Sequence, residues 1–367
     1  MRHPMHPLPS RRALAAALAL SVFSTVPLTA CAKPPKARTV AAQDDNAPDV
    51  VTYGQREDVM RFGTELAARR NLDPAWVNAK LAESRFVPNV AKFIMPPPAG
   101  TAKNWAAYRS RFVEPIRIRA GLAFWRENEK WLVKAHAMYG VPAEIVVGVV
   151  GVESIYGRQM GNFRVIDALA TLSFDFPSGR KDRSAFFRDE LEQFFVMAHS
   201  EDLDPLAPKG SYAGAMGMGQ FMPSSWNKYA VDFDGDGHID MNRSAADVIG
   251  SVAHFLAENG WQRDKPTRFA VEPPVDTSDR ATLLGPDILP TFTVQQFGER
   301  GAALEARAAD YDGKLALVEL QNGAAAPSYI AGTENFYAVT RYNWSSYYAL
   351  AVIELGEAVG RVHRAQP

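Results

Sequence analysis

Cysteine is almost absent from this sequence, because its 367 residues include only one. A single cysteine excludes an intramolecular disulfide, a cysteine-based zinc site and an iron–sulfur cluster. An excess of charge of either sign is also missing, since 40 Lys and Arg stand against 41 Asp and Glu, a formal net charge of -1. Without a broad basic field, nucleic-acid binding is not expected. Beyond the N-terminal segment, no apolar run approaches the ~20 residues that a membrane-spanning helix needs.

The N-terminus contains the one cysteine and a targeting signal. Arg11 and Arg12 precede an apolar stretch over 13–23, and Leu28-Thr29-Ala30-Cys31 follows. This pattern predicts a signal peptide over 1–30, and the tetrapeptide resembles the bacterial lipoprotein box. The resemblance implies cleavage before Cys31 and lipidation of that residue, which would anchor the chain to a membrane. The alternative is an ordinary signal that is cleaved nearby and leaves a free thiol.

The character of the remaining chain changes along its length. Residues 31–50 hold proline, alanine and mixed charges without apolar periodicity, which predicts a solvated tether. Helical patterns dominate 51–135, including one run from Trp125 to Tyr139, and a helical tail over 336–367 is expected to pack with them. Residues 265–335 predict a small β-rich domain with strands at 291–294 and 315–318. A core domain over 136–264 lies between these parts, so the expected fold class is mostly helical α+β.

Glu153 is the most informative single residue. It ends a helix that begins near Val141-Pro142 and is apolar all round over 145–152, so that helix must be buried. Desolvation there should raise the pKa of the Glu153 carboxyl toward that of a usable general acid. On this chemistry alone, a buried Glu that is merely hydrogen-bonded is an equal alternative. Glu144, in the first turn, is interpreted as a carboxylate stabilised by the helix dipole.

A glycine-rich segment over 211–226 follows. Glycines at 214, 217 and 219 allow the backbone to approach a ligand closely, and Gln220 offers both a donor and an acceptor. Neighbouring aromatic side chains offer flat apolar faces. Together these features suit a sugar chain, although glycine runs more often serve backbone turns.

Three motifs in order give this chain a family resemblance. Gly151-Val152-Glu153-Ser154-Ile155-Tyr156-Gly157, the 214–226 segment and Val231-Asp232-Phe233-Asp234-Gly235-Asp236-Gly237-His238-Ile239 resemble the membrane-bound lytic murein transglycosylase B family. The similarity extends from about residue 50 to the tail motif over 335–343. It implies a lysozyme-like helical core flanked by a helical domain and a small β-rich domain, acting on the glycan strands of peptidoglycan.

The resemblance also implies roles for individual residues. Glu153 matches the single catalytic acid/base of the family. The positions that match substrate contacts are Ser211, Gln220, Tyr337, Tyr342, Asn343, Tyr108 and Phe112. The last two also have the alternative of serving as core aromatics.

Residues 232–240 fit the first nine positions of an EF-hand loop. The loop has carboxylates at Asp232, Asp234 and Asp236, the turn glycine at the sixth position and the His238 carbonyl at the seventh. Position twelve is Arg243 instead of a bidentate Glu, so the expected distal ligand is Asp247, or else Asp240. We therefore predict a structural Ca²⁺ and no cofactor for catalysis; the alternative is an Asp–Gly turn without metal.

The predicted function is that of a lytic transglycosylase which cleaves the β-1,4 bond between N-acetylmuramic acid and N-acetylglucosamine and leaves 1,6-anhydromuramic acid ends. No second catalytic carboxyl stands out, because Asp167, Asp175 and Glu190 are interpreted as caps or solvated residues. The alternatives are a hydrolytic muramidase and a calcium-stabilised lipoprotein that binds peptidoglycan without cutting it. The expected location is the periplasmic face of a bacterial membrane, anchored at Cys31 to the outer membrane, with other cell-wall enzymes as possible partners.

Overall fold

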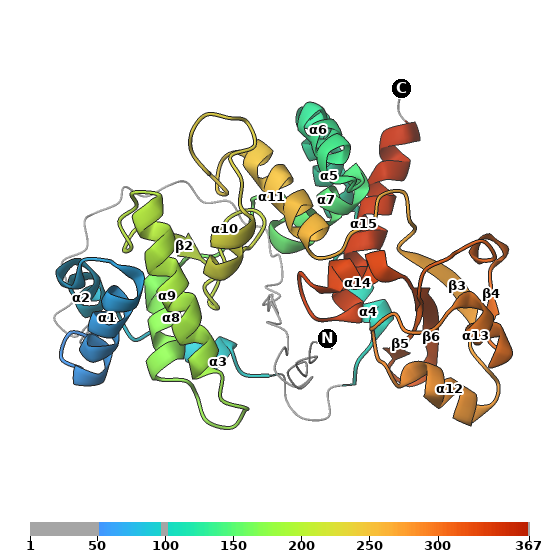
Figure 1. Ribbon diagram of the computed structural model, residues 1–367, viewed down its shortest axis with the longest axis horizontal. Helices are drawn as coiled ribbons and strands as arrows, with labels where there is room; N and C mark the ends of the chain where they lie inside the picture. The colour runs from blue at the N-terminus through green and yellow to red at the C-terminus, as the bar shows by residue number, and fades with distance from the viewer. Residues whose placement is uncertain (1–50, 97–101, 366–367) are drawn as a thin grey trace, which may run out of the picture.

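The computed structural model describes residues 51–96 and 102–365. The predicted signal peptide, the tether and Cys31 lie outside the described residues. Figure 1 shows three groups of elements arranged side by side. The described residues form two hydrophobic cores. The large core runs through the helices, and the small core lies between the sheet and the helices packed on it.

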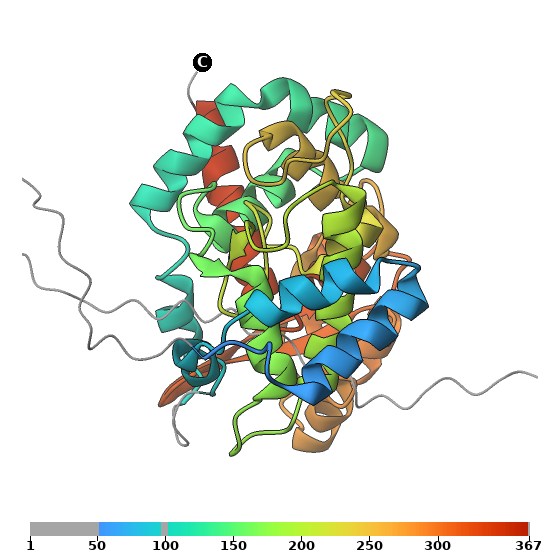
Figure 2. The same cartoon turned by 90° about the vertical axis from the view of Figure 1, so that its left-hand side faces the viewer.

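The first group is a helical lobe. It contains α1 (Glu57–Arg70), α2 (Pro74–Glu83), α3 (Pro88–Phe93), α8 (Val165–Phe174), α9 (Ser184–Ser200), α10 (Pro223–Tyr229) and the short antiparallel pair β1 (Phe163–Arg164) and β2 (Lys209–Gly210). In Figure 2, α1 and α2 cross in front of α8 and α9. Arg69 and Arg70 both bind Glu192 of α9, which attaches α1 to the lobe.

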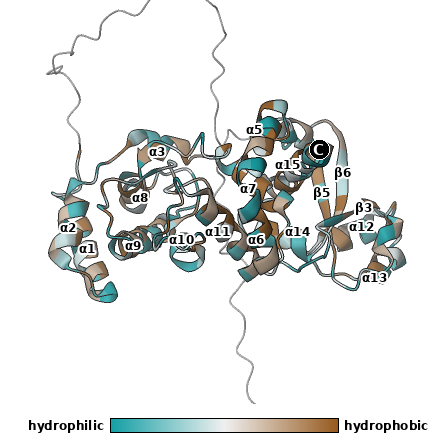
Figure 3. Ribbon diagram, turned by 90° about the horizontal axis from the view of Figure 1, so that it is seen from above, coloured by the Kyte–Doolittle hydropathy of each residue, from teal (hydrophilic) through white to brown (hydrophobic). Residues whose placement is uncertain are grey.

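The second group surrounds α7. It contains α4 (Trp105–Arg109), α5 (Pro115–Glu127), α6 (Glu129–Tyr139), α7 (Ala143–Ser154), α11 (Ala245–Glu258), α14 (Glu334–Thr340) and α15 (Ser346–Ala365). As the sequence predicts, α7 is buried from Ile145 to Val152. In Figure 3, hydrophobic residues of α7 and α15 meet at the centre of this group.

Glycines set the distance between α7 and α15. A Cβ atom at Gly148 would overlap the carbonyl oxygen of Val352, and one at Gly356 would overlap that of Glu144. The two helices therefore touch through their backbones, which close packing allows only where side chains are missing.

The third group is the β-rich part. It contains β3 (Arg268–Glu272), α12 (Thr277–Leu284), α13 (Val294–Glu299), β4 (Ala303–Leu304), the 3₁₀ helix η1 (Ala306–Ala308), β5 (Ala316–Asn322) and β6 (Ala325–Gly332). The strands form an antiparallel sheet in the order β4-β3-β6-β5. Phe269, Phe297 and Leu317 are among the residues of its own core.

The structure corrects four predictions. Residues 51–135 do not pack as one helical domain, because α1 contacts α8 and α9, α2 contacts α9 and α3 contacts α8, whereas α5 and α6 pack against α7 and α6 also against α11. The tail helix α15 packs mainly along α7, and also on α5 and α4. The run from Trp125 to Tyr139 is two helices, broken at Asn128. Residues 291–294 are not a strand, because Thr293 caps α13.

Among the described residues, no single helix is long and apolar enough to cross a membrane. Together, α6 and α7 are long and apolar enough to span a membrane, but the two helices are bent by 116° relative to each other.

Candidate active site

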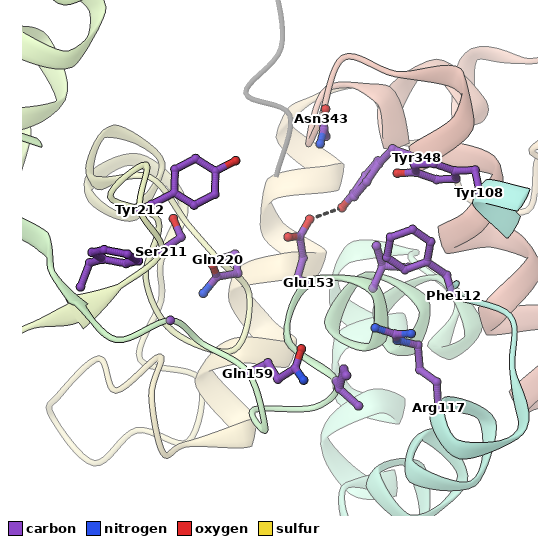
Figure 4. Close-up of a pocket in the computed structure, with 14 residues that line it drawn as sticks. Tyr108, Phe112, Arg117, Glu153, Gln159, Ser211, Tyr212, Gln220, Asn343 and Tyr348 are labelled. Carbon is purple, nitrogen blue, oxygen red and sulfur yellow. Dashed lines mark hydrogen bonds between the residues drawn. The ribbon is translucent and has the colours of Figure 1, made fainter. Parts of the chain in front are cut away.

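Glu153 lies where α7 ends and the chain turns away. Ile155 and Tyr156 both adopt left-handed backbone angles, φ 52° and 55°, directly after it. The side chain is half-buried and lines a pocket of about 200 Å³. Figure 4 shows the carboxyl at the centre of that pocket, with the Tyr348 hydroxyl donating a 2.6 Å hydrogen bond to Oε1.

Burial dominates the electrostatics of this carboxyl. Desolvation raises the pKa of Glu153 from 4.5 to about 7, against the hydrogen bond from Tyr348, which lowers it. Burial together with the Glu153 charge holds the pKa of the Tyr348 and Tyr342 hydroxyls well above 10. Near neutral pH, Glu153 can therefore both donate and accept a proton, as a general acid/base must.

One wall of the pocket comes from the segment after β2. The Ser211 hydroxyl oxygen accepts hydrogen bonds from the backbone of Ala213 and Ala215, at 3.3 and 3.0 Å. Gln220 adopts a left-handed φ of 50°, and its Nε2 donates to the carbonyls of Gly217 and Met160. Gly217 itself has a φ of 71°, and a Cβ atom at this position would overlap the backbone of Met241. The glycines thus serve the turns that hold Ser211 and Gln220 at the pocket.

The opposite wall is aromatic. Tyr108 and Phe112 both line the pocket, with ring centroids 5.0 Å apart. Asn343 lines it as well, and its buried Oδ1 has no hydrogen-bond partner within the described protein. An unpaired buried acceptor is costly, so this oxygen is available to a donor on a ligand.

Two predicted contact residues lie behind this surface. Tyr342 stacks on Tyr348, with centroids 6.4 Å apart, and its hydroxyl donates to the carbonyl of Gly219. It can hold Tyr348 in position but does not line the pocket. Tyr337 packs against Trp344 and Arg341 and is also outside the lining.

Sequence reasoning missed several lining residues. These are Tyr348, Arg117, Gln159, Tyr212, Phe163, Val152, Ile155 and Gly161. Tyr348 stands in a run typical of a core helix, and no local signal marks it as the partner of a residue 195 positions away. Arg117 is 7% exposed, and it donates to the carbonyls of Gly151 and Arg111.

Of the three other acidic residues that the sequence predicts to be caps or solvated, Asp175 is the partly exposed C-cap of α8, whereas Asp167 and Glu190 are buried, contrary to a solvated position. Asp167 is buried and paired with Arg164, and Glu190 is buried and accepts two hydrogen bonds from Ser224. Asp175 binds Arg56 and accepts from the Tyr53 hydroxyl. None of the three lines the pocket, where Glu153 is the one carboxyl among the described residues.

The acidic loop lies between α10 and α11. Side-chain oxygens of Asp232, Asp234 and Asp247 lie within 4.8 Å of one another. Two ligands of one Ca²⁺, each at ~2.3–2.6 Å, can be up to ~5 Å apart, so this spacing fits a shared ion. Asp236 is outside the group and accepts from the backbone of His238. Asp240 instead accepts from the backbone of Asn242 and Arg243.

Known proteins share this architecture. A family model described as the transglycosylase SLT domain matches residues 54–357. The chain belongs to this family. The membrane-bound lytic murein transglycosylase B of Escherichia coli strain K12 is 36% identical over 315 residues, which is 84% of either chain.

Solved structures of this transglycosylase family agree. The soluble lytic transglycosylase SltB1 of Pseudomonas aeruginosa is 36% identical with a TM-score of 0.75, over 84% of this chain and 99% of that one. The Escherichia coli lytic transglycosylase Slt35, solved in complex with calcium, is 34% identical with a TM-score of 0.74. The match covers 89% of this chain and 100% of that one. The predicted family, the mostly helical lysozyme-like fold and the lytic transglycosylase class of enzyme are confirmed.

Proposed function

We propose that this transglycosylase cleaves the β-1,4 bond between N-acetylmuramic acid and N-acetylglucosamine in peptidoglycan, with Glu153 as its single acid/base. The observation that supports this most is that Glu153 is the one carboxyl lining the pocket within residues 51–96 and 102–365, and burial raises its pKa to about 7. The named relative acts on murein, which is consistent with this substrate.

The reaction has two proton transfers through the same group. Protonated Glu153 donates its proton to the glycosidic oxygen, and the bond from that oxygen to C1 of the muramyl ring breaks. The substrate's N-acetyl group stabilises the cation at C1. The C6 hydroxyl of the same ring then attacks C1 and gives its proton to the Glu153 carboxylate. The product is a 1,6-anhydro ring, no water is consumed, and Glu153 is protonated again.

A hydrolytic muramidase is the nearest alternative. Hydrolysis by the usual routes needs a second carboxyl, at ~5–5.5 Å for retention or ~6.5–9.5 Å for inversion. No second carboxyl lines the pocket within the described residues. The C6 hydroxyl has the advantage of effective concentration over water when the ring is held correctly.

Digestion of peptidoglycan in ¹⁸O-labelled water tests the reaction. Mass spectrometry should find muropeptides that end in anhydromuramic acid and carry no label. Reducing muramic ends that carry ¹⁸O would favour the muramidase. If neither wild type nor Glu153→Gln releases fragments while both bind strands, the non-catalytic binder is favoured.

We also propose that the loop over 232–247 holds a structural Ca²⁺. Asp232, Asp234 and Asp247 supply hard oxygen ligands, with Asp236 and the His238 carbonyl as further candidates. A cation would relieve the repulsion among three carboxylates at this spacing. The calcium complex of Slt35 is consistent with such a site.

For location, we propose a lipid anchor at Cys31 that holds the enzyme on the periplasmic face of the outer membrane, with other cell-wall enzymes as partners. The lipobox-like run and the membrane-bound relative support this. Labelled palmitate should enter the wild type and be absent from Cys31→Ala, because the sulfur is an attachment atom. Label in the variant would contradict the anchor, and fractionation of the two membranes would test the location.

A further inference from the structure

We infer that Phe93, Phe163 and Tyr212 form an additional sugar subsite, which binds a pyranose ring of the strand remote from the bond being cleaved. We call these three residues the Phe93 platform. The inference rests on the proposed function, because it takes the occupant to be the continuation of the same glycan strand.

The three rings form one cluster. Phe93 meets Phe163 and Tyr212 edge to face, with ring centroids 6.1 and 5.9 Å away. Phe163 and Tyr212 also line the Glu153 pocket, so the platform is continuous with it. Figure 4 shows Tyr212 beside Ser211, on the far side of Glu153 from Phe112 and Tyr348.

The scaffold under the platform is rigid. Phe163 belongs to β1 and pairs with Gly210 of β2, and the next two residues in the chain are Ser211 and Tyr212. Phe93 is the last residue of α3, which packs on α8 (Figure 3) and holds the fully buried Val90. Rings held in this way lose little conformational freedom when a ligand binds.

Exposure of Phe93 is the observation that points to a ligand. Its side chain is 43% exposed although two aromatic neighbours lie beside it. Exposed apolar surface that continues a binding pocket marks a ligand groove more often than isolated exposed residues do. One face of a pyranose ring carries C–H groups, which pack on the electron-rich faces of aromatic rings.

The size of the pocket fits a ligand that extends beyond it. At about 200 Å³ it is smaller than the ~300–1,000 Å³ of sites that enclose a drug-sized ligand. A polymer bound at Glu153 continues past the pocket, and Phe93 extends the pocket surface next to Phe163 and Tyr212. A sugar bound there adds affinity without touching the reacting atoms.

The test compares substrate lengths in the mature enzyme. Phe93→Ala should lower the ratio of kcat/KM for long glycan strands to kcat/KM for strands of two disaccharide units by ~5–10-fold. Phe93→Trp should retain the ratio, because it keeps an aromatic face. Met138→Ala, an exposed side chain on α6, is the matched control and should not change it. An unchanged ratio in Phe93→Ala, or an equal loss at both lengths, would overturn the inference.

A binding measurement separates this inference from the reaction. In Glu153→Gln, calorimetric titration with N-acetylglucosamine oligomers should show an affinity that rises with length, and addition of Phe93→Ala should remove that rise. If wild type proves inactive while the length dependence persists, the proposed reaction fails and the subsite stands. If the rise persists with Phe93→Ala, the subsite fails.

Discussion

At the scale of the residue, Glu153 shows how position controls acidity. Glu153 lies at the end of an apolar helix, so burial raises the pKa of its carboxyl, and one hydrogen bond from Tyr348 partly offsets this effect. The first chemical step needs the protonated form. Activity should therefore be highest below the pKa of Glu153 and fall as the pH rises through it.

The pH dependence can be tested with Tyr348→Phe. Removal of the hydroxyl removes the interaction that lowers the pKa of Glu153, so the falling limb of kcat/KM, near pH 7 in wild type, should move to higher pH. Tyr347→Phe is the control, because that hydroxyl binds the backbone of Gln321 instead. If the falling limb of kcat/KM in Tyr348→Phe stays at the same pH or moves to lower pH, the proposed effect of Tyr348 on the pKa of Glu153 is contradicted.

Glu153→Gln should separate stability from activity. In the folded protein the pKa of Glu153 is about 7 against an ordinary 4.5, so the protonated form is favoured by folding and its stabilisation is lost as pH rises from about 4.5 to 7. Glutamine cannot lose a proton. Thermal melting should show the two proteins alike at pH 4, and the inactive variant more stable by ~1–3 kcal/mol at pH 8. Equal melting at both pH values would argue against a raised pKa.

At the scale of the element, the contact between α7 and α15 positions the site. These helices carry Glu153 and Tyr348, and Gly148 lies where they touch. Gly148→Ala forces a methyl group against the backbone of Val352 and should cost ~1–3 kcal/mol or more, with a loss of kcat. The measurement is denaturant unfolding together with kinetics.

Gly298→Ala is the matched control for that change. Gly298 lies in α13, and a Cβ there meets nothing within 4 Å. Alanine also has the higher helix propensity, so this variant should be neutral or more stable by up to ~1 kcal/mol. Equal effects of the two substitutions would mean that the helix contact does not limit stability.

The acidic loop is an element whose stability should depend on metal. Ca²⁺ should raise the melting temperature of wild type by mass action, and Asp232→Asn/Asp234→Asn should remove that increment. Asp276→Asn, at the exposed N-cap of α12, is the control and should retain it. Melting that is the same with Ca²⁺ and with chelator would contradict the metal site.

At the scale of the whole molecule, the β-rich part is joined to the helices by two crossings of the chain. Asn335, which is 1% exposed, accepts from the backbone of Gln262 and donates to the carbonyls of Gln262 and Lys265. Thr333 donates to the carbonyl of Pro266 beside it. The side chains of Asn335 and Thr333 thus hold the outgoing and returning segments together.

Asn335→Ala should weaken this junction. Three hydrogen bonds are lost and the buried backbone groups are left unpaired, so unfolding free energy should fall by ~2–4 kcal/mol. The pH profile should stay near that of wild type, because Asn335 does not line the pocket. A variant as stable as wild type would show that the sheet core and α14 hold the parts together without it.

The sequence by itself determined those features that depend on neighbours along the chain. The apolar run that ends at Glu153 is the buried helix α7, as its pattern predicts. The order of the motifs was sufficient to identify the family. Caps and amphipathic periods are set within a few residues, so a linear pattern records them.

Only the tertiary structure decided which distant residues meet. It brought Tyr348 to Glu153, Asp247 to Asp232 and Asp234, and the helices α1 and α2 to α9. It also buried Asp167, which accepts from the distant backbone of Arg85 as well as from nearby Arg164, and Glu190, which accepts from Ser224. Such contacts arise from packing between faces far apart in sequence, where many residues could occupy the same place. Glu153 could therefore be identified from the sequence of its helix, whereas its hydrogen-bond partner Tyr348 could be identified only from the tertiary structure.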